Sequence, residues 1–125
     1  MTAEYAHLRV KMVDGQLRTT GITDARILSA MGSIPREAFL PAIRRPLAYL
    51  DEDIYIPTAS GHPRYLMEPA PFAKLVQLAA IGSADRVLDV GCGTGYSSAV
   101  LSQLAASVDG LECEADLAES ARASL

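Results

Sequence analysis

The stretch VLDVGCGTGYSSAVL, residues Val87 to Leu101, carries the strongest signal for the fold. A mostly apolar run, residues 86–90, is followed by glycines at alternate positions, Gly91, Gly93 and Gly95, and then by a helix-like pattern. The run RVLDV predicts a buried strand, and residues 96–106 predict a helix. Glycines between a strand and a helix let the backbone turn sharply and approach a ligand at the helix N-terminus. The stretch therefore predicts a ligand-binding strand, loop and helix.

The same alternation continues to the end of the chain. SVDGLE, residues 107–112, predicts a second strand, and residues 115–125 predict a second helix. Strand, helix, strand and helix in this order predict an α/β fold with a parallel sheet and a right-handed crossover. Because two strands leave a sheet edge bare and the chain stops within a helix, we expect a truncated chain or a homo-oligomer that covers this edge.

Residues before the glycine loop predict helices and an irregular segment. A helix is expected over residues 5–18, and a second one starts after Thr23 as its N-cap and closes at Gly32, ahead of a short helix that ends before Pro41. Residues 41–71 carry six of the seven prolines and predict two short strands, near residues 54–56 and 64–66. Another helix is expected from Pro69 to Gly82.

Composition excludes several classes of protein. The 125 residues are 50% hydrophobic, which suits one packed domain. Eleven basic residues against fifteen acidic ones, with no basic cluster beyond Arg44 and Arg45, argue against nucleic-acid binding. No apolar run predicts a membrane span or signal peptide, so we expect a cytoplasmic protein. Cys92 and Cys113 are expected to be free thiols, and their spacing predicts no metal site.

Two carboxylates flank the glycine loop. Asp89 precedes Gly91 by two residues, and Glu112 follows Gly91 by 21 residues at the end of the second predicted strand. Neighbouring ends of parallel strands meet where ligands bind, so Glu112 is placed to accept hydrogen bonds from both hydroxyls of a ribose. Nicotinamide cofactors fit less well, because Asp89 would repel a pyrophosphate and Tyr96 replaces the third glycine of their G-x-G-x-x-G fingerprint. S-adenosylmethionine, which carries an amino group and no phosphate, fits better.

Each feature also has a simpler explanation. Asp89 could cap the helix or pair with Arg86, Glu112 could be a solvated strand end, and the glycines could serve only a tight turn. Tyr96 is expected to pack over the loop.

The chain resembles the protein-L-isoaspartate O-methyltransferase family of the class I S-adenosylmethionine-dependent methyltransferases. The resemblance lies in MVDGQLRTTGITDARILSAMGSIPREAFLP (residues 12–41), in AYLDEDIYI (residues 48–56), in the glycine loop and in GLECEADLAESAR (residues 110–122). It implies a Rossmann-like domain whose first half is residues 69–125, preceded by a helical extension and an irregular acceptor-side segment over residues 1–68. Asp89, Gly91, Cys92, Gly93, Gly95 and Glu112 would bind S-adenosylmethionine.

The resemblance also implies methyl transfer to a carboxylate of damaged protein, so the partner is a protein or peptide. Such an acceptor needs no strong base, and neither His7 nor His62 is expected to be catalytic; no catalytic residue is assigned. The acceptor side would be bordered by Met67, Glu68 and Pro69, where Met67 takes the place of the family's serine. Methionine cannot donate that serine's hydrogen bond, and Glu68 would repel an anionic acceptor unless Arg64 pairs with it. The alternative is therefore a cofactor-binding regulatory or assembly module with an altered acceptor or none.

The resemblance bears on length as well. The family's catalytic domain continues through further strands and helices, so we expect the 125 residues alone to be incomplete and inactive, and the activity to belong to the full-length protein.

Overall fold

A computed structural model of the chain describes residues 2–125. The first helix, α1, spans Thr2–Met12, and the chain continues through a π-helical turn at Val13–Leu17 and a 3-10 turn at Arg18–Thr20. The helix predicted over residues 5–18 is therefore present, although its last part is wound differently. Met12 and Leu17 are buried at 1% and 0% exposure and attach this segment to the core.

The second helix, α2, spans Ala25–Ser33, and its predicted N-cap at Thr23 is wrong. Asp24 is the N-cap, because its carboxylate accepts a hydrogen bond from the backbone N–H of Arg26 at 2.9 Å. The Arg26 side chain also donates to this carboxylate and lowers the pKa of Asp24. The backbone N–H groups of Thr23 and Asp24 both donate to the Gln77 side-chain oxygen, at 2.9 and 3.1 Å.

An irregular segment with two short strands follows. After 3-10 helices at Arg36–Phe39 and Ala42–Leu47, strands β1 (Ile54–Ile56) and β2 (Arg64–Leu66) form an antiparallel hairpin. Both strands lie where the sequence predicts them. Helix α3 spans Pro69–Ala79, so it starts as predicted but ends before the predicted Gly82. Its C-cap is Ala80, which adopts the left-handed conformation at φ 50°.

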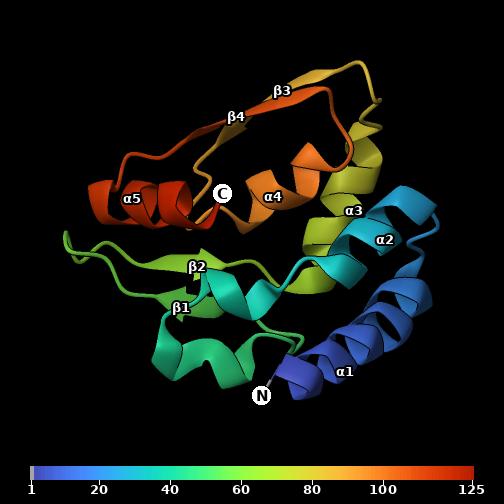
Figure 1. Ribbon diagram of the computed structural model, residues 1–125, viewed down its shortest axis with the longest axis horizontal. Helices are drawn as coiled ribbons and strands as arrows, with labels where there is room; N and C mark the ends of the chain where they lie inside the picture. The colour runs from blue at the N-terminus through green and yellow to red at the C-terminus, as the bar shows by residue number, and fades with distance from the viewer. Residues whose placement is uncertain (1) are drawn as a thin grey trace.

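The second half of the chain forms the predicted parallel unit. Strand β3 (Arg86–Val90), helix α4 (Tyr96–Ser102), strand β4 (Ser107–Leu111) and helix α5 (Ala115–Ser124) follow in order, and β3 pairs with β4 in parallel. Helix α4 is shorter than the predicted 96–106. Figure 1 shows α4 and α5 on the same side of the two-stranded sheet. The predicted α/β fold with a parallel sheet is confirmed.

The prediction that β3 is buried is wrong for one of its faces. Val87 and Asp89 turn toward α4 and are partly covered, whereas Leu88 and Val90 are 62% and 70% exposed and Leu111 of β4 is 57% exposed. The run RVLDV predicts a fully buried strand because strands of parallel sheets usually have helices on both faces. In residues 2–125 both helices of the unit cover the same face.

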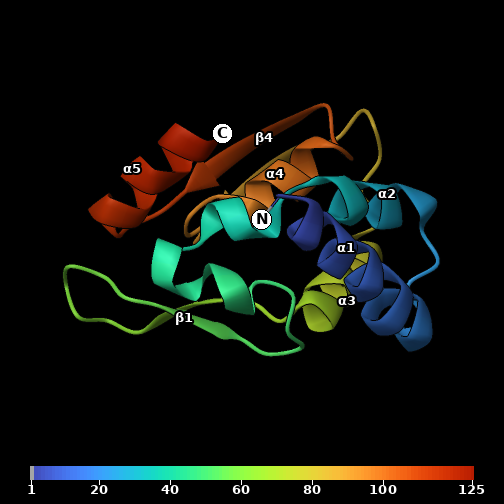
Figure 2. The ribbon, with the colours of Figure 1, turned by 60° about the horizontal axis from the view of Figure 1, so that its bottom comes forward.

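One continuous cluster of buried apolar side chains joins the two parts of the chain. It runs from Met12 and Met31 in the N-terminal helices to Tyr96, Val100 and Leu117 in the α/β unit. Figure 2 shows α1, α2 and α3 gathered at one end and the β1–β2 hairpin at the other, beneath the β3–β4 sheet. None of the helices within residues 2–125 is long and apolar enough to cross a membrane.

Candidate functional site

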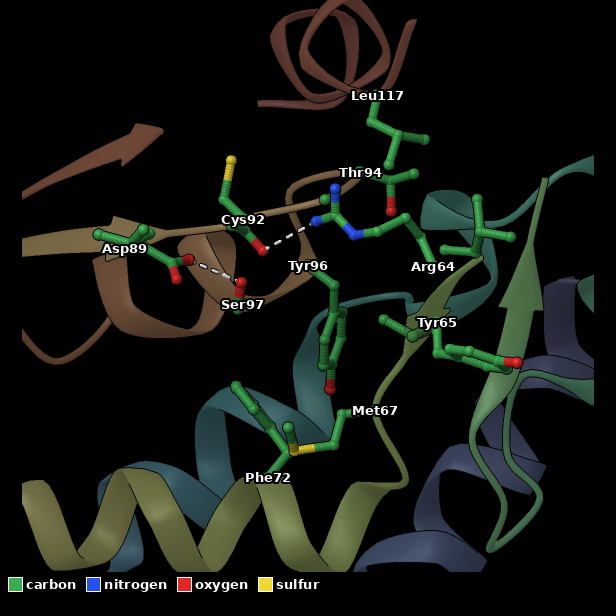
Figure 3. A pocket seen from close by; sticks show the side chains of 15 residues that line it. Arg64, Tyr65, Met67, Phe72, Asp89, Cys92, Thr94, Tyr96, Ser97 and Leu117 are labelled. Carbon is green, nitrogen blue, oxygen red and sulfur yellow. Dashed lines mark hydrogen bonds between the residues drawn. The ribbon is translucent and has the colours of Figure 1, made fainter. Parts of the chain in front are cut away.

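A cavity of about 230 Å³ lies between the β1–β2 hairpin and the glycine loop. Residues 64–67 form one wall and residues 89–94 the opposite wall, with Ile56, Phe72, Tyr96, Ser97 and Leu117 completing it. Figure 3 shows the labelled side chains of both walls around this space. The hairpin and the loop are separated by α3 in sequence, so only the tertiary fold brings them together.

The structure brings together some of the residues that the sequence singles out. Five of them line the cavity: Met67, Asp89, Gly91, Cys92 and Gly93. The other four do not line it: Glu68, Pro69, Gly95 and Glu112. Thr94, Ser97, Phe72 and Leu117 also line the cavity, although no sequence motif marked them as site residues. Thr94 lies in the glycine loop itself, whereas the positions of Phe72, Ser97 and Leu117 depend on how α3, α4 and α5 pack.

Gly93 and Gly95 need glycine for different reasons. Both have left-handed backbones, with φ of 57° and 103°. A Cβ added to Gly93 would meet no protein atom within 4 Å, so the space beside this residue is open. A Cβ added to Gly95 would lie 3.2 Å from Leu125 and 3.3 Å from Ala121, so Gly95 lets α5 pack against the start of α4. Gly91 also lines the cavity with a left-handed backbone (φ 74°), but a Cβ there would lie 3.8 Å from the Arg64 guanidinium, so the space beside Gly93 is the more open.

Asp89 fixes the first turn of α4 against the sheet. Its Oδ2 accepts hydrogen bonds from the Ser97 hydroxyl at 2.6 Å and the Ser98 hydroxyl at 2.8 Å. Figure 3 shows the contact with Ser97 at the edge of the cavity. Asp89 thus bonds to side chains in the first turn of α4 without capping a backbone N–H of that helix, and it also lines the cavity.

Glu112 is bound by the chain itself. Its two carboxylate oxygens accept hydrogen bonds from the Arg64 guanidinium at 2.5 and 2.6 Å, and also from the backbone N–H groups of Gly93 at 2.8 Å and Glu114 at 2.9 Å. The Glu112 side chain is only 1% exposed. The hydrogen bonds from Arg64 lower the pKa of Glu112 to about 2. Arg64 therefore pairs with Glu112 and not with Glu68.

A buried arginine links the cavity wall to the N-terminal segment. Arg36 is 0% exposed, and its guanidinium donates to the backbone carbonyls of Ala48 at 2.6 Å and Met67 at 2.7 Å. It also lies 4.9 Å from the centre of the Tyr96 ring, a cation–π contact. Burial lowers the pKa of Arg36. Arg36 thus holds the backbone at Met67 in place.

Tyr96 is a packing residue, as expected, but its ring packs against Phe39 and Phe72 rather than over the loop. Its ring centre lies 5.6 Å from that of Phe39 and 5.8 Å from that of Phe72, and the residue is 2% exposed. Figure 3 shows its side chain extending toward Met67 and Phe72. Burial raises the pKa of the Tyr96 phenol, so the hydroxyl stays protonated.

The remaining candidate groups do not form a reactive centre. Burial raises the pKa of the Cys92 thiol, which keeps it protonated and a poor nucleophile, and Cys113 is an exposed free thiol. His62 lies on the exposed hairpin with its Nδ1 3.4 Å from a Glu114 oxygen, and His7 is exposed on α1. Among residues 2–125 there is no cluster of three histidine, cysteine or acidic side chains that could hold a metal ion.

The fold and the site together define a class. A parallel βαβ unit with a glycine loop at the first strand end, and acids at the ends of both strands, is the cofactor-binding half of a Rossmann-like domain. The family model of the protein-L-isoaspartate(D-aspartate) O-methyltransferases matches residues 9–125. The chain belongs to this family, which confirms the resemblance seen in the sequence.

Individual relatives agree with this assignment. Protein-L-isoaspartate O-methyltransferase 2 of Anaeromyxobacter sp. (strain Fw109-5) is 45% identical over 109 residues, which are 87% of this chain and 43% of that protein. The Koribacter versatilis (strain Ellin345) protein-L-isoaspartate O-methyltransferase is 45% identical over 114 residues, which are 91% of this chain and 50% of that protein. The chain thus spans about half the length of these curated relatives.

Solved structures show the same fold. A protein-L-isoaspartate O-methyltransferase superposes with a TM-score of 0.81 at 26% identity, over 93% of this chain and 37% of that one. A structure from Plasmodium falciparum, in complex with S-adenosyl-L-homocysteine, gives a TM-score of 0.70 at 23% identity over 93% of this chain and 54% of that one.

Proposed function

We propose that this chain forms the cofactor-binding part of an S-adenosylmethionine-dependent O-methyltransferase that methylates a carboxylate of damaged, isoaspartyl-containing protein. The observation that carries the proposal is the open space beside Gly93, whose left-handed backbone lines a cavity together with Asp89 and whose N–H donates to Glu112. Family membership supports the same activity.

The residues around the cavity fit this cofactor. Asp89 accepts both serine hydrogen bonds on Oδ2, so Oδ1 is the oxygen through which it would receive the methionyl amino group, directly or through water. Gly91, Cys92 and Gly93 would let the main chain lie against the cofactor, and Glu112 would hold the ribose hydroxyls. The presence of S-adenosyl-L-homocysteine in the Plasmodium falciparum structure is consistent with this assignment. Gly95 would support the loop indirectly, by letting α5 pack against the start of α4.

Methyl transfer to a carboxylate requires the protein mainly to align the methyl donor with the acceptor. S-adenosylmethionine, when bound, supplies a methyl group activated by its sulfonium charge. A carboxylate is nucleophilic enough to accept that methyl group, so the chain's work is to orient both partners and to exclude water. Met67, Phe72 and Leu66 form an apolar wall suited to excluding water, and Arg36 fixes the backbone of that wall. Met67, with Glu68 and Pro69 next to it, would border the methyl-transfer region.

We also propose that the protein acts in the cytoplasm on protein or peptide substrates, without nucleic acid. A homo-oligomer formed through the bare edge of the β3–β4 sheet is consistent with the two-stranded arrangement.

Cofactor binding is tested by calorimetric titration with S-adenosyl-L-homocysteine. Gly93→Ala places a methyl group in the open space and should abolish measurable binding if the cofactor lies there. Gly21→Ala is the matched control, because Gly21 also has a left-handed backbone (φ 90°) with no atom near its absent Cβ, but it lies at the end of the N-terminal helical segment. Equal affinity in both variants would contradict the proposed site, and so would tight binding of NAD alone.

Methyl transfer is tested on the protein as its gene encodes it. Incubation with methyl-labelled S-adenosylmethionine and an isoaspartyl peptide should yield a base-labile methyl ester. A protein that binds S-adenosyl-L-homocysteine but forms no ester, beside an active family member, would contradict the isoaspartyl acceptor and favour the binding-module alternative.

A further inference from the structure

Arg64 is paired with Glu112, the carboxylate that the proposed function assigns to the ribose hydroxyls. Its two terminal nitrogens donate to the two oxygens of Glu112, one to each, at 2.6 and 2.5 Å. This bidentate geometry is the strongest form of arginine–carboxylate contact. The Glu112 side chain is 1% exposed and does not line the cavity.

The two remaining hydrogen bonds of Glu112 come from the backbone. Gly93 N–H donates to Oε1 and Glu114 N–H donates to Oε2. Each oxygen therefore already accepts two hydrogen bonds, which fills the lone pairs of the carboxylate. A ribose that uses both oxygens of Glu112 must first displace the guanidinium, since the backbone donors are fixed by the loop and by the start of α5.

We propose that Arg64 is an affinity-determining residue that competes with the cofactor ribose for Glu112. The proposal rests on the proposed function, because it takes Glu112 as the ribose ligand. The two hydroxyls of a ribose replace the two guanidinium N–H donors one for one, so the carboxylate keeps four hydrogen bonds throughout. The Arg64–Glu112 pair must be broken before the ribose binds, so the free energy of that pair makes cofactor binding less favourable.

Displacement of Arg64 also frees one of the attachments of the hairpin. Arg64 is the first residue of β2, three residues before Met67. The tip of the hairpin is held separately at the start of α5, where the Ser60 hydroxyl contacts Glu114 at 2.7 Å and the backbone N–H of Ala59 donates to Asp116 at 3.0 Å. Figure 1 shows the tip reaching this end of α5. These contacts attach the hairpin without touching Glu112. Weakening them therefore tests the effect of hairpin anchoring apart from competition for Glu112.

The test compares the affinity of three proteins for S-adenosyl-L-homocysteine by calorimetry. Arg64→Met keeps the aliphatic stem but removes the donors, and should lower Kd about tenfold, the size expected when one net charge-assisted interaction no longer has to be broken. Ser60→Ala, which loosens the tip and leaves the Arg64–Glu112 pair in place, should bind within about twofold of the unmodified protein by the same scale.

The outcomes separate this proposal from the proposed function. Equal or weaker binding by Arg64→Met overturns the competition but leaves the cofactor site standing. An equal gain in Ser60→Ala assigns the effect to hairpin opening and also overturns it. Absence of binding in all three proteins contradicts the proposed function itself.

A measurement on the unmodified protein guards against misfolding of the variant. The guanidinium N–H signals of Arg64, observed by ¹⁵N NMR, should be protected from exchange by the pair and lose that protection when S-adenosyl-L-homocysteine saturates the site. Protection that persists at saturation would overturn the proposal.

Discussion

The buried Glu112 carboxylate makes the stability of this fold depend on pH in a defined window. Its pKa is lowered from an ordinary 4.5 to about 2, mainly by the hydrogen bonds from Arg64. A shift of this size corresponds to about 3 kcal/mol, and screening at the 25% exposed Arg64 side chain reduces it to about 2 kcal/mol. Because the folded state binds this proton more weakly than the unfolded state, the stabilisation is complete above pH 4.5 and is lost as the pH falls through about 2.

The assay is urea unfolding followed by circular dichroism from pH 7 to pH 3, on the unmodified protein and on Glu112→Gln. At pH 7 the variant should be less stable by about 2 kcal/mol, and by pH 3 less than about half of that difference should remain. Asp109→Asn, on the exposed face of β4, is the control and should differ little at any pH. A difference between the unmodified protein and Glu112→Gln that stays constant over this range would refute the reasoning.

Three further predictions test the fold. Asp24→Ala removes the N-cap of α2 and should cost about 1 kcal/mol by urea unfolding, whereas Thr23→Ala should cost less; the reverse order would restore Thr23 as the cap. Met31→Ala, at a fully buried position, should cost about 2–5 kcal/mol and lower Tm in a thermal melt; a loss below about 1 kcal/mol would contradict its place in the core. Arg36→Met leaves the carbonyls of Ala48 and Met67 without their donor and should cost about 2 kcal/mol or more by urea unfolding; an unchanged or raised stability would contradict the role of Arg36.

Local signals in the sequence predicted most elements of secondary structure. The alternation around Asp89 and Glu112 predicted the parallel unit, because strands and crossover helices have different hydrophobic periods and the glycines mark their junction. The helix ends were less well predicted. Thr23 and Asp24 are both good caps, and only the hydrogen bond from the Arg26 backbone N–H to the Asp24 carboxylate shows which one the helix uses.

The sequence by itself determined the family, the order of the elements and the identity of the loop, because these depend on residue types at short spacing. The tertiary structure decided what surrounds the loop. Arg64 lies 48 residues from Glu112 in sequence, and Arg36 lies 31 residues from Met67; each pair meets only because the hairpin and the N-terminal segment fold beneath the β3–β4 sheet. Hydrogen bonds between distant residues leave no periodic trace in the sequence, so the occupied state of Glu112 could be seen only once the chain was folded.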